Sequence, residues 1–475
     1  MQPGMQVGPM AAVMRASTPP YGPVLGARTG PVRVRTERRR RLLAAAAAVL
    51  ALAILGLCGP TARAAEAQAP ALPWWKGVTH AHSRWSDGAD FPEMVADWYK
   101  SHGYNFLVTT DHDTLQEGER WSPLVNQPRD RVRLQEYQKW LGGQEVPLRE
   151  QTDAKTGKPV QAARLRALAD YRARFEEPGR FILIPGEEIS DACGKVQVHV
   201  VAVNLAEKIL PLKGPSIPET LARHFTAVAQ QAQRLKQPML AILAHPNWGG
   251  VVPVEDWQAA PDLRFFEVMN SVITSSDNTG DGKRLSTDRL WDVALSARLS
   301  RLGLGPVYGI AADDMHDVQP KGGAGWIGVR SKELTPAGLV AAMNAGEFYA
   351  STGVRLKDVR RNAREYAIEV DPDPGVTYTI QFIGTFPGYD RSTEDARDGK
   401  GALLPPTQRY AEDIGRVLKE VKGAKAAYTP TGKELYVRAK VISSKPRPAR
   451  DPDGRVKGAA EVAWTQPVVI AAPAR

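Results

Sequence analysis

Cysteine is scarce in this sequence. Among 475 residues only Cys58 and Cys193 occur, and Cys58 lies in an N-terminal segment that we expect to be removed. The single remaining thiol excludes an intrachain disulfide. We interpret Cys193 as an inert thiol rather than as a nucleophile.

Acidic residues are almost absent from the first 65 residues. Glu37 stands there against nine arginines, so this segment carries +8 of the formal net charge of +10 and the rest of the chain about +2. Behind the basic run that ends at Arg41 comes an apolar run over residues 42–57, and then the small-residue sequence Ala-Arg-Ala at 62–64. This order is typical of a secretory signal. We predict a disordered leader and signal peptide over residues 1–65.

Long apolar runs are also missing. The run at 42–57 is shorter than the ~20 apolar residues that a membrane span needs. We therefore expect an exported protein, periplasmic or secreted, with no stable membrane span after signal cleavage. An uncleaved N-terminal helix that anchors the chain is the alternative.

Two functional classes lack their usual signals. A charge near +2 for the mature chain disfavours nucleic acid as a partner, because binding to the phosphate backbone requires a strongly basic surface. No nucleophile elbow of the form G-x-S-x-G occurs, so the sequence gives no sign of a serine hydrolase of that type.

Between residues 72 and 354 short apolar runs alternate with amphipathic segments. Helical spacing occurs at 92–103, 218–236, 285–303 and 335–346, and strand-like runs at 104–113, 181–190, 196–204, 239–248, 264–271 and 306–317. This alternation predicts an α/β fold with a mostly parallel sheet or barrel. In a β/α barrel, active sites lie at the carboxyl ends of the strands.

Two segments depart from this pattern. A charged insertion, about residues 115–180, has helical spacing in its second part, 161–177. It is either a lid or a solvated decoration. Alternating apolar and polar residues at 376–382 and 434–441 predict a small antiparallel β domain over residues 355–475.

Histidine is rare, with eight in the chain, and six of them lie in or directly after strand-like runs. His80 and His82 are two positions apart, which at a strand end places both on one face. Two imidazoles so placed can hold one transition metal. We expect the two histidines in helical segments, His102 and His224, at the surface. The other four are His112, His199, His245 and His316.

Carboxylates accompany these histidines. Asp87 follows in S-D-G, Glu188 ends the G-E-E sequence, and Asp314 precedes His316 in D-x-H. Each has an ordinary structural explanation, such as a turn cap. Together, however, they would bury several charges near one edge, which is unfavourable unless the charges are paired. Nitrogen and oxygen ligands without a thiolate favour zinc, iron or manganese over calcium.

In this order, the motifs H-x-H, S-D-G, T-D-H-D, G-E-E, a strand histidine, A-H-P and D-x-H resemble those of the PHP (polymerase and histidinol phosphatase) family over about residues 77–353. The resemblance implies a distorted (β/α)7 barrel at 72–354 with two or three divalent metal ions (Zn, Mn or Fe) at its rim. The implied metal ligands are His80, His82, Asp87, His112, Glu188, His199, His245, Asp314 and His316.

The resemblance also divides these ligands among three ions and rejects their neighbours Glu187 and Asp313. One ion would have His80, His82 and Asp314; Glu188 would bridge to a second, with His199 and His245; the third would have Asp87, His112 and His316.

The sequence at 346–354 and parts of the C-terminal region are similar to exported PHP relatives of the CehA/McbA metallohydrolase type. The resemblance implies a phosphoesterase that cleaves phosphate esters of a small molecule through a metal-activated hydroxide. Hydrolysis of carboxylic or carbamate esters at the same site is the alternative. A nucleic-acid-processing PHP domain and a non-catalytic metal-containing surface protein are less favoured. Arg84 is a possible contact for substrate phosphate, or else a solvated loop arginine.

Overall fold

The computed structural model describes residues 72–125, 128–248, 251–271, 285–318, 322–397, 401, 403–447 and 459–470. The predicted leader and signal peptide therefore lie outside the described residues. Residues 72–475 form one compact unit. Of the helices in the described part of the chain, none combines the length and the apolar character needed to cross a membrane.

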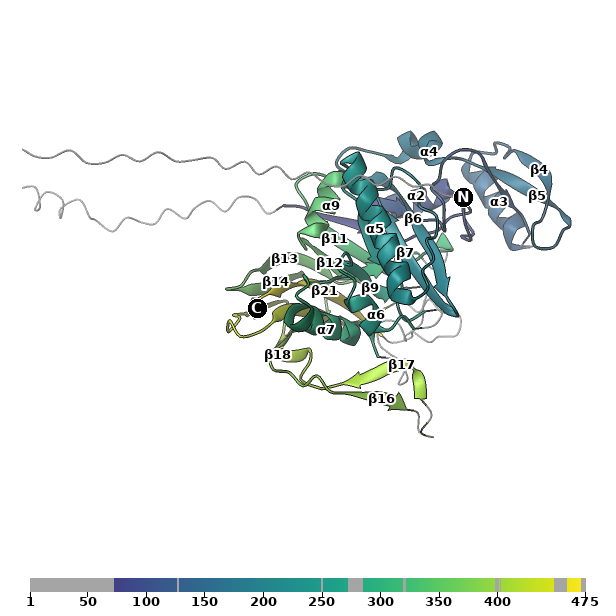
Figure 1. Ribbon diagram of the computed structural model, residues 1–475. Coiled ribbons are helices and arrows are strands. Elements are labelled where there is room, and N and C mark those ends of the chain that lie inside the picture. Colours follow the sequence, from purple (N-terminus) through teal and green to yellow (C-terminus); the bar gives the residue numbers. More distant parts are fainter. Residues whose placement is uncertain are drawn as a thin grey trace, which may run out of the picture. The chain divides into compact units, whose positions relative to one another are not determined.

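A 13-stranded mixed sheet organises this unit, in the order β10-β9-β8-β7-β6-β2-β1-β11-β12-β21-β20-β15-β18 (Figure 1). The expected α/β class is confirmed. The strands of its first part are β1 (Trp74–Val78), β2 (Phe106–Thr109), β6 (Ile182–Cys193), β7 (Val196–Val203), β8 (Leu240–Leu243), β9 (Phe265–Asn270), β10 (Tyr308–Ala312), β11 (Trp326–Arg330) and β12 (Phe348–Ser351).

The sheet is less parallel than the alternation of elements predicts. Strands β1, β2 and β6 pair in parallel, as do β8, β9 and β10, but β7 is antiparallel to both of its neighbours. The cause is a tight turn, Gly194–Lys195, in which Cys193 pairs with Val196 and Gly194 has a φ of 62°. A two-residue turn can join only antiparallel strands.

The strand order is linear, and a closed (β/α)7 barrel is not shown. The segments that follow β1 and β10 nevertheless meet. Ala81 forms a parallel bridge with Met315, and the His82 N–H donates to the Met315 carbonyl at 2.8 Å. The chain after β1 thus lies beside the chain after β10.

Helices cover the sheet through apolar faces. Helix α5 (Ile217–Leu235) packs against β6, β7 and β8 (Figure 1). Ser216 precedes it as the N-cap residue, and its side chain accepts a hydrogen bond from the Glu219 N–H. The other helices of this part are α2 (Pro92–Ser101), α6 (Val254–Gln258), α7 (Thr287–Ala297), the π-helical turn η1 (Arg298–Leu302) and α9 (Pro336–Asn344).

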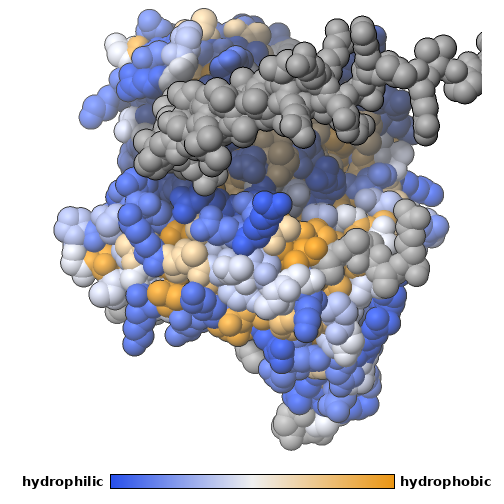
Figure 2. All heavy atoms as spheres, turned by 90° about the vertical axis from the view of Figure 1, so that its left-hand side faces the viewer, coloured by the Kyte–Doolittle hydropathy of each residue, from blue (hydrophilic) through white to orange (hydrophobic). Residues whose placement is uncertain are grey.

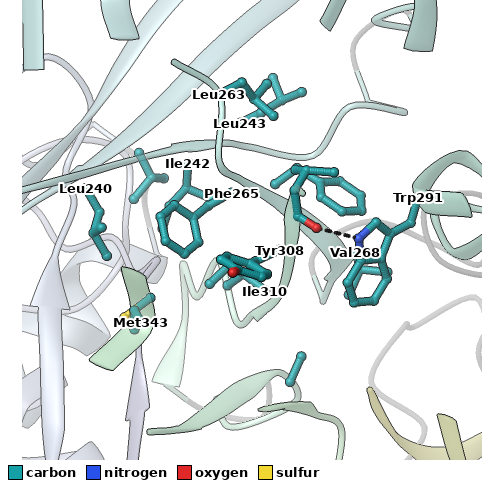
Figure 3. Close-up of a cluster of buried hydrophobic side chains, with 14 of the residues drawn as sticks. Leu240, Ile242, Leu243, Leu263, Phe265, Val268, Trp291, Tyr308, Ile310 and Met343 are labelled. Atoms are coloured by element: carbon teal, nitrogen blue, oxygen red, sulfur yellow. Dashed lines mark hydrogen bonds between the residues drawn. The ribbon is translucent and has the colours of Figure 1, made fainter. Parts of the chain in front are cut away.

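A hydrophobic core fills the space between these elements (Figure 3). Phe265 of β9 pairs with Ile242 of β8 on one side and with Tyr308 of β10 on the other, and all three are buried in this core. The buried Trp291 of α7 donates its indole N–H to the Val307 carbonyl at 2.8 Å. On the face shown in Figure 2, hydrophilic residues predominate and hydrophobic ones form only small patches.

Part of the insertion forms a small three-stranded sheet of its own, in the order β3-β5-β4. Helix α3 packs on this sheet, because its Tyr137 shares an apolar cluster with Ala163 and Leu165 of β5. Helix α4 packs instead against α2 and β6. Helical spacing at 161–177 predicts one helix, but there β5 runs to Leu165 and α4 begins only at Leu168. Pairing of Ala162 and Ala163 with β3 and β4 overrides the local helical preference. The elements are β3 (Arg120–Pro123), α3 (Arg129–Trp140), β4 (Leu148–Thr152), β5 (Pro159–Leu165) and α4 (Leu168–Phe175).

The expected C-terminal antiparallel strands are present, and four of them continue the large sheet. Strand β12 pairs with β21 through Ala350 and Trp464, so the sheet passes without a break across the predicted domain boundary at 354/355. The division into two domains stays a prediction. The C-terminal strands are β13 (Arg355–Arg361), β14 (Tyr366–Asp371), β15 (Tyr378–Thr385), β16 (Thr393–Arg397), β17 (Leu403–Tyr410), β18 (Arg416–Lys422), β19 (Lys425–Tyr428), β20 (Tyr436–Pro446) and β21 (Ala460–Val469).

Candidate metal centre

The predicted ligands lie in or after six strands of the first part of the sheet, β1, β2, β6, β7, β8 and β10. His80 and His82 follow β1, and His112 follows β2. Glu188 and His199 lie within the β6–β7 hairpin, on the same face, because His199 pairs with Ser190, two residues after Glu188. His245 follows β8, Asp314 and His316 follow β10, and Asp87 lies in the segment between β1 and α2.

The innermost ligands are His80, His82 and Asp314. The Nε2 atoms of the two histidines lie 3.1 Å apart. Oδ1 of Asp314 is 3.0 Å from His82 Nε2 and 3.4 Å from His80 Nε2. All three side chains are buried.

Glu188 lies at the middle of the centre. Its Oε1 is 2.9 Å from both His199 Nδ1 and His245 Nε2. Its Oε2 is 2.9 Å from His112 Nδ1 and 3.4 Å from His80 Nε2. Burial opposes ionisation of this carboxyl, but the surrounding histidines, His80 foremost, hold its pKa well below the usual range. Burial likewise opposes protonation of His80, yet Asp314, Glu267 and Glu188 raise its pKa.

The outer part of the centre opens to solvent. Oδ2 of Asp87 is 3.3 Å from His316 Nε2 and 3.6 Å from His112 Nε2. The exposed fraction of the side chain is 55% for Asp87, 28% for His112 and 27% for His316. A ligand from solution therefore reaches the centre from this side.

All nine predicted ligands fall into groups whose candidate ligand atoms lie within 4.8 Å of one another, and the rejected neighbours Glu187 and Asp313 fall into none of these groups. The first predicted group recurs unchanged. The outer group gains His82, and Glu188 is grouped with different pairs of histidines than predicted. The groups are His80, His82 and Asp314; His80, Glu188 and His245; His112, Glu188 and His199; and His82, Asp87, His112 and His316.

The donor set fits divalent cations. Glu267 Oε1 lies 2.7 Å from His80 Nδ1, so a neutral His80 keeps its proton on Nδ1 and turns its Nε2 lone pair towards His82 and the carboxylates. Within the described residues, the buried oxygens Asp314 Oδ1 and Glu188 Oε2 lie at 3.0 Å from His82 Nε2 and 2.9 Å from His112 Nδ1 but accept no well-aligned hydrogen bond. Lone pairs and carboxylate oxygens that converge in this way repel one another unless positive charge lies between them.

Several residues around the centre escaped prediction. Glu267, in the apolar run of β9, is fully buried; a lone carboxylate within such a run was the available signal. Asp111 accepts from the Ser83 N–H at 2.8 Å and the Ser86 hydroxyl at 2.7 Å, and so fixes the loop that carries Asp87. Trp248, 41% exposed, lies with its ring centroid 5.0 Å from that of His245.

Arg84 is buried rather than solvated. Its guanidinium donates to Asp130 at 2.9 Å and to the Pro123 carbonyl at 3.0 Å, which ties the loop after His82 to the insertion. Because these donors already have partners, the geometry favours a structural role, and contact with substrate stays a prediction.

The two helical histidines differ. His102 is exposed, as expected, and stacks on Trp98. His224 is fully buried, so its expected surface position is wrong. It lies on the apolar face of α5 and accepts the Leu212 N–H at 3.0 Å. Burial lowers the pKa of His224 to about 4.

No protein-family model matches this sequence, and no curated protein is similar enough to match it. Among solved structures, the chain is similar to a two-domain protein from Bacteroides vulgatus that contains a predicted PHP-like metal-dependent phosphoesterase, at 16% identity over 76% of this chain and 97% of that one, with a TM-score of 0.35. It is also similar to an amidohydrolase from Chromobacterium violaceum, at 18% identity over 51% of this chain and 88% of that one, with a TM-score of 0.25. Likenesses this distant do not establish a family.

Proposed function

We propose that this chain is a metal-dependent hydrolase of the PHP family that cleaves phosphate esters of a small molecule. The observation that carries the proposal is the convergence of all nine predicted ligands in one centre, although their positions extend from 80 to 316 in the sequence. The ordered motifs support the family, and the convergence supports two or three divalent cations of zinc, manganese or iron.

The arrangement has the parts that ester hydrolysis needs. Divalent cations in such a site bind a phosphoryl group and lower the pKa of water into the neutral range. The buried histidines and Glu188 fix the geometry of the centre, while the exposed side, with Asp87, His112 and His316, admits the ester. No side-chain nucleophile is required for this chemistry.

The test is release of phosphate from aryl phosphates in the presence of added Zn²⁺, Mn²⁺ or Fe²⁺. We expect turnover by the wild-type chain and a loss of at least about 100-fold in His80→Ala, by analogy with the 10–100-fold effect of groups that only support metal ligands. His102→Ala, which removes an exposed histidine outside the centre, is the matched control. Equal rates for wild type and His80→Ala would remove the proposal.

Carboxylic or carbamate esters are the alternative substrates, supported by the similarity of residues 346–354 to CehA/McbA-type relatives. An aryl acetate and an aryl carbamate, assayed beside the aryl phosphate with the same variants, distinguish the two. Turnover of the acyl esters alone would move the assignment to the alternative.

We also propose that the protein is exported to the periplasm or secreted, on the basis of the predicted signal at residues 1–65. N-terminal sequencing of protein recovered from a bacterial host tests this, and we expect the mature chain to begin just after Ala64. A chain that retains its apolar run and pellets with membranes would indicate the anchored form instead.

A further inference from the structure

Glu267 lies beneath the buried side of the metal centre. It belongs to β9 and is fully buried. Its Oε1 accepts from His80 Nδ1 at 2.7 Å, and its Oε2 accepts from the backbone N–H of His245 at 2.8 Å. One carboxylate thus holds the ring of one predicted ligand and the backbone of another.

Asn270 extends this arrangement to a third ligand. Its Nδ2 donates to Glu267 Oε2 at 2.8 Å and to Asp314 Oδ2 at 3.0 Å. Residues three apart on a regular strand point to opposite faces. Here the register between β9 and β10 skips Val268, since Ile310 pairs with Glu267 and Ala311 with Met269. Such a bulge redirects side chains next to a site, and it brings Asn270 onto the side of Glu267.

Two of the ligands held in this way have an unfavourable backbone. His245 has a φ of 22° and Asp314 a φ of 47°. Positive φ is uncommon for residues other than glycine and is maintained only where the surroundings enforce it. The hydrogen bond from His245 N–H to Glu267 and the bond from Asn270 to the Asp314 carboxylate supply that enforcement.

The exposed ligands have other supports. His112 Nδ1 is 2.6 Å from the Ser190 hydroxyl. His316 Nδ1 is 2.9 Å from the Asp314 carbonyl. Asp87 lies on the loop that Asp111 fixes through Ser86. The centre therefore has two differently supported halves.

We propose that Glu267 and Asn270 are positioning residues that set the metal affinity of the buried half of the centre and leave the exposed half largely unchanged. The inference rests on the proposed metal-dependent function. In it, Glu267 keeps the proton of His80 on Nδ1, so that Nε2 is free to bind a cation, and the pair keeps His245 and Asp314 in their positive-φ conformations.

The number of hydrogen-bond acceptors explains why glutamine cannot replace Glu267. Both carboxylate oxygens accept hydrogen bonds, but an amide has only one acceptor. If the amide oxygen faces His80, the amide NH₂ opposes the His245 N–H. If the amide is turned, its NH₂ forces the His80 proton onto Nε2 and blocks ligation.

The experiment is a titration of the full mature chain with Zn²⁺ by calorimetry and with Co²⁺ by visible absorption. The Asp87→Asn variant shows which class of metal sites, and which Co²⁺ absorption bands, belong to the exposed half. For Glu267→Gln we expect the metal affinity of the buried half to fall by about 10–100-fold and its Co²⁺ bands to change. The metal affinity of the exposed half should change by less than about threefold. Asn270→Ala should shift the metal affinity of the buried half in the same direction by a smaller factor.

Glu93→Gln is the control, because Glu93 is an equally buried glutamate that accepts the Tyr137 hydroxyl outside the centre. The inference would be overturned if Glu267→Gln bound metal in both halves with wild-type affinity, or if both halves lost the same amount of affinity. The same loss of affinity in Glu93→Gln would also overturn it. Should Glu267→Gln fail to fold, Asn270→Ala is judged by the same criteria. If the wild-type chain binds metal and the variants shift affinity as expected, but no ester is hydrolysed, only the proposed function is contradicted. If the wild-type chain binds no metal, both the proposed function and this inference are contradicted.

Discussion

Glu188 illustrates how much one residue does in this molecule. It is fully buried, and its two oxygens lie within 2.9 Å of nitrogens of His112, His199 and His245. The neighbouring Glu187 is equally buried but points to the other face of β6, where it accepts the Ile209 N–H at 2.6 Å. Adjacent, chemically identical residues thus serve different purposes because side chains alternate along a strand.

We therefore expect Glu188→Gln to lose bound metal and at least about 100-fold in ester hydrolysis, since loss of a group that only supports metal ligands already has a 10–100-fold effect. Glu187→Gln should keep its metal and lower only thermal stability. Metal content and phosphate release of the two purified variants check this. A metal-free Glu187→Gln beside a metal-bound Glu188→Gln would reverse our assignment of the G-E-E motif.

The buried His224 makes stability depend on pH. Its pKa falls from 6.5 to about 4 on burial, so the unfolded chain binds a proton at a higher pH than the folded chain. The stabilisation is complete above pH 6.5 and is lost as pH falls from 6.5 towards 4. The loss amounts to roughly 3 kcal/mol at 1.36 kcal/mol per pKa unit. Urea unfolding of wild type and His224→Gln at pH 7 and pH 4.5 tests it: the wild-type chain should lose more, and parallel losses would contradict the prediction.

The residues of the candidate site were easier to predict from the sequence than the residues that support them. The rare histidines, their carboxylate companions and the resemblance to the PHP family pointed to nine residues that the structure groups together; that they bind metal stays a prediction. Glu267, Asn270 and Asp111 were not identified, because their function depends on partners up to 187 residues away and on a bulge that no spacing rule announces. His224 was misplaced because a polar residue in an amphipathic helix is usually exposed.

At the scale of elements, α7 and β20 are joined by buried charge. Arg438 of β20 is almost fully buried and donates to Asp292 of α7 at 2.6 Å. Tyr436 donates to the same carboxylate at 2.6 Å, and Asp288 contacts both Arg438 and Lys440. This network fastens the C-terminal strands to a helix of the first part of the chain.

Asp292→Ala should lower the free energy of unfolding by about 3–5 kcal/mol, because it leaves the Arg438 charge buried with one partner fewer. Asp395→Ala breaks the exposed ion pair with Arg397 and should change the free energy of unfolding by less than about 1 kcal/mol. Urea unfolding at pH 7 measures both. Similar small losses in the two variants would show that the buried network contributes little.

Element type was predicted better than element pairing. Helices and strands lie near the expected positions, but antiparallel β7 and the strand at 159–165 were not foreseen. Pairing in both cases is decided by contacts beyond the local window: the Gly194–Lys195 turn in the first, and the partner strands β3 and β4 in the second.

At the scale of the whole molecule, the large sheet runs from the candidate metal centre into the C-terminal strands through β12 and β21. The change to alternating apolar and polar residues after residue 354 indicates a separate β domain, but this pattern carries no information about whether two sheets join. Because the sheet is continuous, an experiment must decide whether residues 72–354 fold without the C-terminal strands.

A chain that ends at Val354 should aggregate or unfold. It exposes the edge of β12, and an exposed edge strand recruits other chains. It also leaves Asp288 and Asp292 without Arg438. Size-exclusion chromatography and circular dichroism of the truncated and mature chains test this. A monomeric, cooperatively folded fragment would instead support two independent domains.

The β6–β7 hairpin gives the centre an unexpected dependence on loop length. Glu188 and His199 share a face only because the Gly194–Lys195 turn fixes the register between their strands. A one-residue shift of that register would turn His199 to the opposite face from Glu188, with every ligand still in the sequence. A variant with one amino acid inserted after Gly194 should therefore assemble the centre only if the longer turn absorbs the extra residue and leaves the register unchanged.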